Sequence, residues 1–214
     1  MPDHAPDVLL VTTPGCPHCA SVHAALKALR EQGLIRGLEI IDAGAEPDRA
    51  AELGVRAAPW IRIGPFVLTG AQTQQQLKEW AERAAGGLGM TEYLEHLLAN
   101  GELEQAEQLM NQAPEQLEAL LPLILKTETP IQVRLGISSL LESHAGSPEL
   151  QRLLPALAGL CGHGDHRLRA DACYFLGLTR SADARPALLE RLRDDSPEVR
   201  EIAEEALAEL PAAH

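Results

Sequence analysis

The feature that most constrains this chain is a pair of cysteines, Cys16 and Cys19, separated by a proline and a histidine. The pair follows an aliphatic run at residues 8–11 and a Pro-Gly breaker, and it precedes apolar residues that recur at helical spacing from residue 20 onwards. An aliphatic run that ends at such a breaker predicts a buried strand, and the later spacing predicts a helix with one face packed on a sheet. We therefore expect the cysteines at a strand-turn-helix junction.

This placement gives the two thiols different chemistry. With Cys16 as the helix N-cap and Pro17 as the first helical residue, the unpaired amides and the macrodipole of the helix start stabilise a Cys16 thiolate. We predict that Cys16 is the exposed nucleophile and that Cys19, almost one turn later, is the less accessible resolving thiol. Pro17 and His18 are then the residues that tune the Cys16 pKa, His18 through positive charge or a hydrogen bond.

Two cysteines at this spacing also occur as half of a tetrahedral zinc site. Such a site needs two further ligands, usually a second pair at regular spacing, and the first part of the chain contains no such pair. A sparse group of cysteines and histidines occurs later, at Cys161, His163, His166 and Cys173. There we favour buried structural cysteines over a metal site. We therefore favour redox chemistry for the first pair and expect neither a metal nor a cofactor.

Composition and charge narrow the class of partner. The 214 residues suffice for two modest domains, and an aromatic content of 3% with abundant Ala, Leu and Glu favours a largely helical chain. The net charge of −13 argues against nucleic acid or an anionic membrane as a main partner. Most of this charge lies in residues 88–214, which hold 21 acidic and 10 basic side chains, against 10 and 8 in residues 1–87.

The sequence also favours a cytoplasmic location. Residues 1–4 carry no basic segment followed by an apolar core, and no later stretch approaches about 18 uninterrupted apolar residues. Four cysteines, of which two are closely paired, do not form the framework of a secreted disulfide-rich protein.

Residues 1–87 predict an α/β domain. Strands are expected at residues 8–11, 38–42, 61–63 and 66–68, with helices after the cysteine pair, at 47–53, and after the capping residue Thr73. The order is βαβαββα, a parallel pair joined by a helical crossover and followed by a hairpin.

Residues 8–87 thereby resemble the thioredoxin superfamily in the short form of glutaredoxins. Two motifs carry the resemblance: the cysteine pair, and the Val-Arg-Ala-Ala-Pro segment at residues 55–59, at the position of the family's cis-proline loop. The resemblance implies that the Ala58–Pro59 bond is cis and that the Ala58 backbone lies beside Cys16 and pairs with an extended substrate. Trp60 follows this loop, so we expect Ala58, Pro59 and Trp60 to bind substrate, with core packing as the alternative for Trp60.

The tetrapeptide itself is similar to that of periplasmic disulfide-introducing oxidases rather than to the Cys-Gly-Pro-Cys of thioredoxins. The chain lacks the helical insertion of those oxidases. It also has Gly15 where thioredoxins have tryptophan, and Leu10 where thioredoxins bury an aspartate that assists proton transfer from the resolving thiol. The resemblance therefore leaves the direction of electron flow open.

A glycine-rich segment at residues 86–89 separates this domain from a helical one, predicted at 88–214. Helices are expected at 91–99, 102–111, 114–126, 129–144, 148–161, 165–178, 182–193 and 196–210. A Val-Arg or Leu-Arg phrase recurs near three helix starts, at Arg134, Arg169 and Arg200. The phrase and its period resemble HEAT-type repeats, which implies an α-solenoid with a concave surface that binds protein or peptide. The alternative is that the solenoid merely stabilises or dimerises the chain.

We thus predict a cytoplasmic thiol-disulfide oxidoreductase whose helical-repeat domain recruits a protein partner, with a protein thiol or disulfide as substrate. One alternative is a redox-sensitive binding scaffold with little catalytic turnover. Another is metal handling through the Cys16–Cys19 pair.

Overall fold

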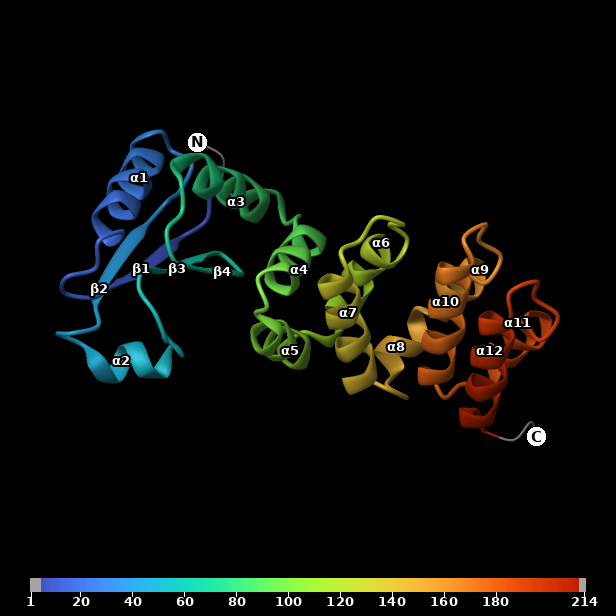
Figure 1. The fold of residues 1–214 in the computed structure, drawn as a ribbon. Coiled ribbons are helices and arrows are strands. Elements are labelled where there is room, and N and C mark those ends of the chain that lie inside the picture. Colours follow the sequence, from blue (N-terminus) through green and yellow to red (C-terminus); the bar gives the residue numbers. More distant parts are fainter. Residues whose placement is uncertain (1–4, 212–214) are drawn as a thin grey trace. The chain divides into compact units, whose positions relative to one another are not determined.

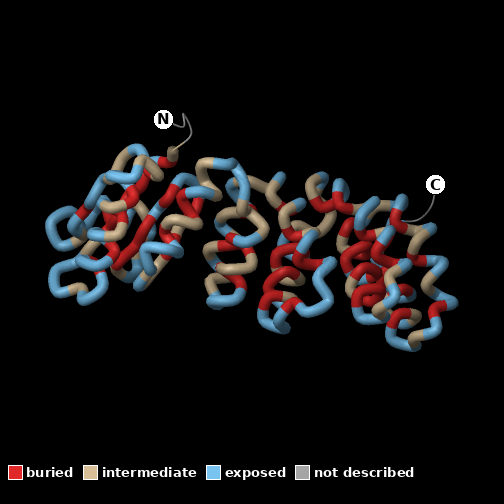
Figure 2. The backbone as a smooth tube through the Cα atoms, turned by 90° about the horizontal axis from the view of Figure 1, so that it is seen from above, coloured by how far each residue is buried: buried red, intermediate tan, exposed pale blue. Residues whose placement is uncertain are grey.

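The computed structural model describes residues 5–211, so that residues 1–4, on which part of the prediction of location rests, lie outside the described residues. The chain divides into two compact units between Gly89 and Met90. The first is an α/β domain and the second, as far as it is described, is helical (Figure 1). Buried hydrophobic residues occur in both units, so each unit has its own core (Figure 2). No helix within residues 5–211 is long and apolar enough to span a membrane.

The first unit is built on a four-stranded mixed sheet. Its elements are β1 (Val8–Thr12), α1 (Cys19–Glu31), β2 (Leu38–Asp42), α2 (Pro47–Glu52), β3 (Trp60–Ile63), β4 (Phe66–Thr69) and α3 (Gln74–Gly86). The strand order is β2-β1-β3-β4, with β1 parallel to β2 and antiparallel to β3, which pairs with β4 as a hairpin. The predicted order βαβαββα is confirmed.

The central position of β1 explains its aliphatic sequence. Both faces of the strand are covered, because α1 and α3 pack together on one side of the sheet and α2 lies on the other (Figure 1). Leu10 and Val11, which point to opposite faces, are therefore both fully buried. On the edge strand β2, by contrast, Ile40 is exposed.

The helix α3 begins as the sequence predicts. The Thr73 Oγ1 accepts a hydrogen bond from the Gln76 amide at 3.2 Å, and the Thr73 amide donates to the Gln76 Oε1 at 2.9 Å. This reciprocal capping box satisfies two amides at the helix start. Leu77, Trp80 and Ala81 form its buried face.

The second unit is a succession of short helices. They are α4 (Met90–Ala99), α5 (Leu103–Gln112), the 3-10 helix η1 (Pro114–Leu120), α6 (Leu121–Ile124), α7 (Ile131–Ser143), α8 (Pro148–Arg152), α9 (Leu154–Leu160), α10 (His166–Leu178), the 3-10 helix η2 (Ala182–Ala184), α11 (Arg185–Arg191) and α12 (Pro197–Glu209).

The prediction of continuous helices at 114–126, 148–161 and 182–193 is wrong, because each is split in two. The second part of each carries a proline in its first turn, at Pro122, Pro155 and Pro186. A proline inside a continuous helix would remove a backbone hydrogen bond and clash with the preceding turn, whereas the first turn of a new helix tolerates it.

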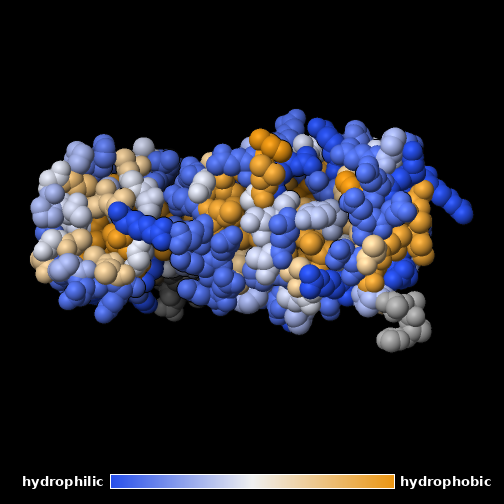
Figure 3. Space-filling model, turned by 60° about the horizontal axis from the view of Figure 1, so that its bottom comes forward, coloured by the Kyte–Doolittle hydropathy of each residue, from blue (hydrophilic) through white to orange (hydrophobic). Residues whose placement is uncertain are grey.

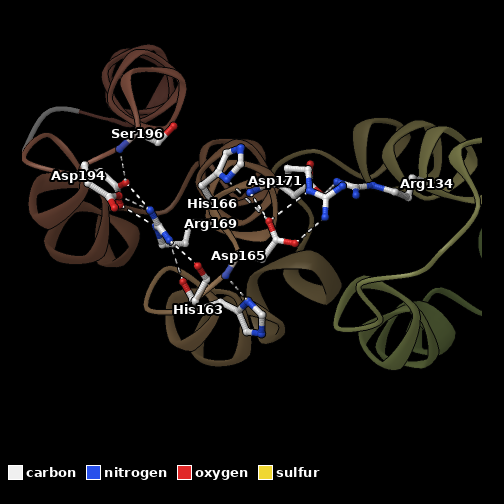
Figure 4. A network of polar contacts seen from close by, with 11 residues as sticks. Arg134, His163, Asp165, His166, Arg169, Asp171, Asp194 and Ser196 are labelled. Atoms are coloured by element: carbon white, nitrogen blue, oxygen red, sulfur yellow. Dashed lines mark hydrogen bonds and ion pairs between the residues drawn. The ribbon is translucent and has the colours of Figure 1, made fainter.

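Two arginines of the repeated phrase, Arg134 and Arg169, lie at contacts with the loops and helices beside them (Figure 4). Arg169 on α10 donates to both carboxylate oxygens of Asp194, at 2.8 and 2.6 Å, and to the backbone carbonyl of His163 at 3.0 Å. Arg200 donates to the Asp194 carbonyl at 2.7 Å, and Arg134 on α7 pairs with Asp171 on α10. Arg134 and Arg169 therefore link successive parts of the repeat region, whereas Arg200 holds the loop before its own helix.

The Arg169–Asp194 pair is buried, with exposed side-chain fractions of 10% and 2%. The Arg169 guanidinium holds the pKa of Asp194 well below its usual value, although burial acts in the opposite direction. We expect Arg169→Ala to lower the free energy of unfolding by about 3 kcal/mol, because the buried Asp194 carboxylate loses its two shortest charged hydrogen bonds and keeps a longer one from Arg191, at 3.4 Å. Urea unfolding of the full chain measures this change.

Arg167→Ala is the matched control. This arginine lies two residues away and pairs with Asp165, but its side chain is 59% exposed. Solvent screens such a pair, so its removal should change stability little. Equal losses in the two variants would contradict the assignment of Arg169 as a link between repeats.

Candidate active site

The predicted cysteine pair lies where β1 gives way to α1. The Sγ atoms of Cys16 and Cys19 are 2.11 Å apart and their Cα atoms 5.5 Å apart, so the pair forms a disulfide. The turn before it is closed by the Cys16 amide, which donates to the Thr13 carbonyl at 3.2 Å. The strand-turn-helix context predicted for the pair is therefore present.

The prediction that Cys16 is the N-cap and Pro17 the first helical residue is wrong. The helix α1 begins at Cys19, its N-cap is His18, and that side chain makes no capping hydrogen bond. Instead the Cys19 amide donates to the Cys16 Sγ at 3.1 Å, which is the kind of contact that an N-cap oxygen usually makes. The turn thus holds Cys16 just outside the helix but keeps its sulfur on the first helical amide.

Exposure separates the two sulfurs. Cys16 is partly exposed, whereas Cys19 is 6% exposed and lies on the buried face of α1. Pro17 and His18, between them, are exposed. A partner therefore reaches Cys16 first, and Cys19 lies behind it.

The loop at residues 55–59 comes to the same end of the sheet. In the antiparallel register of β1 with β3, Trp60 lies opposite Val11, so the residues before Trp60 extend beyond the carboxyl end of β1 toward the cysteine turn. The Ala58–Pro59 bond is cis, which confirms the prediction. Ala58 is partly exposed and Pro59 is buried.

Trp60 itself lies in the core. Its exposed fraction is 5%, and it packs in a cluster with Leu9, Val11, Ile41 and Ala50 on the side of the sheet that faces α2. This is the alternative that the sequence left open. The tryptophan therefore anchors the start of β3 just after the cis bond.

Two departures from thioredoxins have visible consequences. Gly15 has a φ of 77°, in the left-handed region that strains a residue with a side chain, so a tryptophan would not fit this turn without a change in the backbone. Leu10 is fully buried within β1, so the position that holds an aspartate in thioredoxins offers no carboxyl group here.

Metal ligation finds no support in the described part of the chain. Among residues 5–211, no group of three or more His, Cys, Asp or Glu side chains is arranged to hold a metal ion. Cys161 and Cys173 are both buried, as the sequence predicts.

Comparison with protein families agrees with this geometry. Residues 7–82 match the model of the thioredoxin domain, and residues 114–208 match the model of HEAT repeats. The chain is a thioredoxin-like domain followed by HEAT repeats. No curated protein matches it significantly. A thioredoxin-like domain with a close cysteine pair supports redox activity of the thiol-disulfide kind.

The different burial of the two sulfurs in the thioredoxin-like domain has a measurable consequence. In the reduced protein, iodoacetamide should modify Cys16 at least about tenfold faster than Cys19, because alkylation requires an accessible thiolate. Mass spectrometry of the peptides after short reaction times gives both rates. In urea the two rates should converge, and a faster reaction of Cys19 in the folded protein would contradict the assignment.

Proposed function

We propose that the protein is a thiol-disulfide oxidoreductase that exchanges its Cys16–Cys19 pair with a protein partner held by the HEAT repeats. The observation that carries this proposal is a closed disulfide with one partly exposed sulfur and one buried sulfur, at the end of β1 reached by the cis-proline loop. We place the redox domain at residues 1–87 and the repeat domain at 88–214. Exchange of this kind needs no cofactor.

In the reducing direction, the Cys16 thiolate attacks one sulfur of a disulfide in the partner. The partner's S–S bond breaks, its second sulfur leaves with the electron pair and takes up a proton, and a mixed disulfide with Cys16 remains. The Cys19 thiolate then attacks the Cys16 sulfur and releases the partner's first thiol. The partner gains two electrons, and the chain ends in the disulfide form that the structure shows.

The residues around the pair support these steps. The hydrogen bond from the Cys19 amide to the Cys16 sulfur stabilises negative charge on that sulfur, and Pro17 and His18 shape the exposed turn that carries it. Because Leu10 offers no carboxyl group, water or His18 takes the Cys19 proton. We propose that an extended substrate segment pairs with the Ala58 backbone beside Pro59, with Trp60 fixing this loop from the core.

Serine variants separate the two steps. Cys16→Ser should abolish the reduction of insulin disulfides by dithiothreitol above the uncatalysed rate, because no attacking thiol remains. Cys19→Ser should accumulate a mixed disulfide between Cys16 and insulin that survives non-reducing electrophoresis. Undiminished reduction by Cys16→Ser would contradict the proposal, and reduction by the unmodified protein no faster than the uncatalysed rate would favour a redox-sensitive scaffold.

The surface that we propose for the partner is a groove in the repeat domain, between α7, α10 and α12. It has a volume of about 510 Å³, and its lining includes Ile131, Leu135, Tyr174 and Ile202. Ile131 and Leu135 are 71% and 64% exposed, one turn apart on α7. Exposure of this degree is unusual for large aliphatic side chains so close together. Hydrophobic residues also reach the surface of this domain between hydrophilic ones in Figure 3.

Charge indicates what this groove binds. The lining itself carries both signs of charge, with Lys126, Arg134 and Arg167 beside Asp171 and Glu198. Glu142 accepts a hydrogen bond from the Tyr174 hydroxyl at 2.6 Å at its edge. The excess of negative charge lies on the domain around the groove. The repeat domain as a whole carries a net charge of −11 within residues 88–214. We therefore propose that the groove takes an apolar segment flanked by lysine or arginine, and neither nucleic acid nor a membrane.

A synthetic amphipathic peptide of leucine and lysine tests this surface by fluorescence anisotropy. Leu135→Gln should weaken its binding about tenfold, because one large apolar contact is lost. Leu189→Gln, on α11 and outside the groove lining, is the matched control and should bind normally. Equal affinity for a leucine and glutamate peptide would contradict the charge argument.

We also propose a cytoplasmic setting. The support for it is the cysteine content, because four cysteines with two of them closely paired do not form the framework of a secreted disulfide-rich protein.

A further inference from the structure

The turn that carries Cys16 has a neighbour that follows the adjacent strand. Thr12 and Asp42 are partners in the parallel register of β1 with β2, so the segments that leave these two strands begin side by side. One segment is the cysteine turn at residues 13–16, and the other is the loop at residues 43–46, which leads into α2. The second segment takes no part in the chemistry proposed above.

Hydrogen bonds fix the loop at residues 43–46 in place. The Ala43 amide donates to the Thr12 carbonyl at 2.8 Å, which ties the loop to the end of β1. The Gly44 amide donates to the Asp42 Oδ1 at 2.8 Å, and the next two amides donate to the Asp42 carbonyl at 3.0 and 2.8 Å. Each amide of the loop before α2 therefore has a partner, and a shift of the loop would break these bonds.

Gly44 is the point at which this loop meets the cysteine turn. A Cβ atom on Gly44 would lie 3.0 Å from both Cγ and Cδ of Pro14, and 3.2 Å from the Asp42 Oδ1. The Asp42 side chain is exposed and can rotate, whereas the proline ring is closed onto its own backbone, so the turn must move with it. Gly44 and Pro14 are also exposed, and Gly44 lacks the left-handed φ that favours glycine. Neither core packing nor backbone conformation therefore requires a glycine here.

The place of the turn determines the environment of the Cys16 sulfur. Pro14 and Gly15, whose φ is 77°, occupy the second and third positions, as is typical of a type II turn. The Cys16 amide closes the turn on the Thr13 carbonyl, and the Cys16 Sγ accepts the hydrogen bond from the Cys19 amide at 3.1 Å. Displacement of the turn therefore disturbs the bond that stabilises negative charge on this sulfur.

We propose that Gly44 is a positioning residue for exchange at Cys16, because its missing side chain leaves the space in which Pro14 seats the cysteine turn. This inference rests on the proposed function of the Cys16–Cys19 pair. With the turn seated, the Cys19 amide stabilises the Cys16 thiolate and so the reduced form, which makes the disulfide a stronger oxidant. A side chain at position 44 makes the pair a weaker oxidant.

The test is the pH dependence of Cys16 alkylation by iodoacetamide, followed by mass spectrometry of the peptide that contains Cys16. Each full chain carries Cys19→Ser, so that one thiol remains in the turn. Gly44→Ala should raise the midpoint of the pH profile by about one unit, because the thiolate loses part of a charge-assisted hydrogen bond. Ala45→Ser, at the exposed neighbouring position, is the matched control and should leave the midpoint unchanged. Urea unfolding should give nearly equal stabilities for the two variants, since neither position is buried.

Pro14→Ala shows whether the proline transmits the effect. It removes the two ring carbons that the new Cβ would meet, so Gly44→Ala should shift the midpoint little in a chain that also carries Pro14→Ala. An unchanged midpoint in Gly44→Ala, or an equal shift with and without Pro14→Ala, would overturn the proposal. Should Gly44→Ala alone fail to fold, recovery of the fold by Pro14→Ala supports the contact, and continued failure overturns it.

The alkylation measurement involves no partner protein. A chain that reduces insulin no faster than the uncatalysed rate would contradict the proposed function and still show the shift of the midpoint in Gly44→Ala. A chain that reduces insulin normally but shows no shift would contradict the role of Gly44 alone.

Discussion

The pairing of β1 with β3 in a single register is the constraint on which the first domain depends. This register sets Trp60 opposite Val11 and so brings the cis bond before Trp60 to the end of β1 that carries the cysteine turn. A slip by one residue would turn every side chain of β3 to the opposite face. Ile61 and Ile63 would then exchange places with Arg62, which is exposed, while both isoleucines are fully buried. The burial of those isoleucines therefore also fixes the distance between the two segments of the active site.

Much of this arrangement could be predicted from local patterns. The strand alternation at Ile61 and Ile63, the cap at Thr73 and the breaker before Cys16 each contain their signal within a few residues. The start of α1 could not be located in the same way. The observed N-cap is His18 and not Cys16, because the helix follows a turn in which the Cys16 sulfur accepts a hydrogen bond from the Cys19 amide. The prolines Pro122, Pro155 and Pro186, which divide three of the predicted helices, are visible in the sequence. However, the spacing of apolar residues is the same around a proline that starts a new helix and around one within a helix, so this spacing could not reveal the breaks.

Contacts between distant residues were the least accessible to prediction. The arginines belong to a sequence motif that repeats near three helix starts. This motif does not indicate that Arg169 pairs with Asp194 or that Arg134 pairs with Asp171. The groove beside Leu135 depends on which helical face remains uncovered. Periodicity indicates that a helix has an apolar face, but the partner of that face follows from the tertiary structure.

The ion pairs of the repeated arginines Arg134 and Arg169 run in one direction along the chain. Each of Arg134 and Arg169 pairs with a carboxylate that comes later in the sequence, at Asp171 and at Asp194. During synthesis from the amino terminus, α10 is therefore complete well before the acidic loop that neutralises its buried arginine has left the ribosome. Until then, Arg169 has the backbone carbonyls of its own preceding loop as partners, and its charge favours a hydrated, loosely packed helix. The last repeat thus completes the packing of the repeat before it. A nascent chain that ends before residue 194 lacks the carboxylate that neutralises Arg169, so α10 cannot yet pack fully against its neighbours.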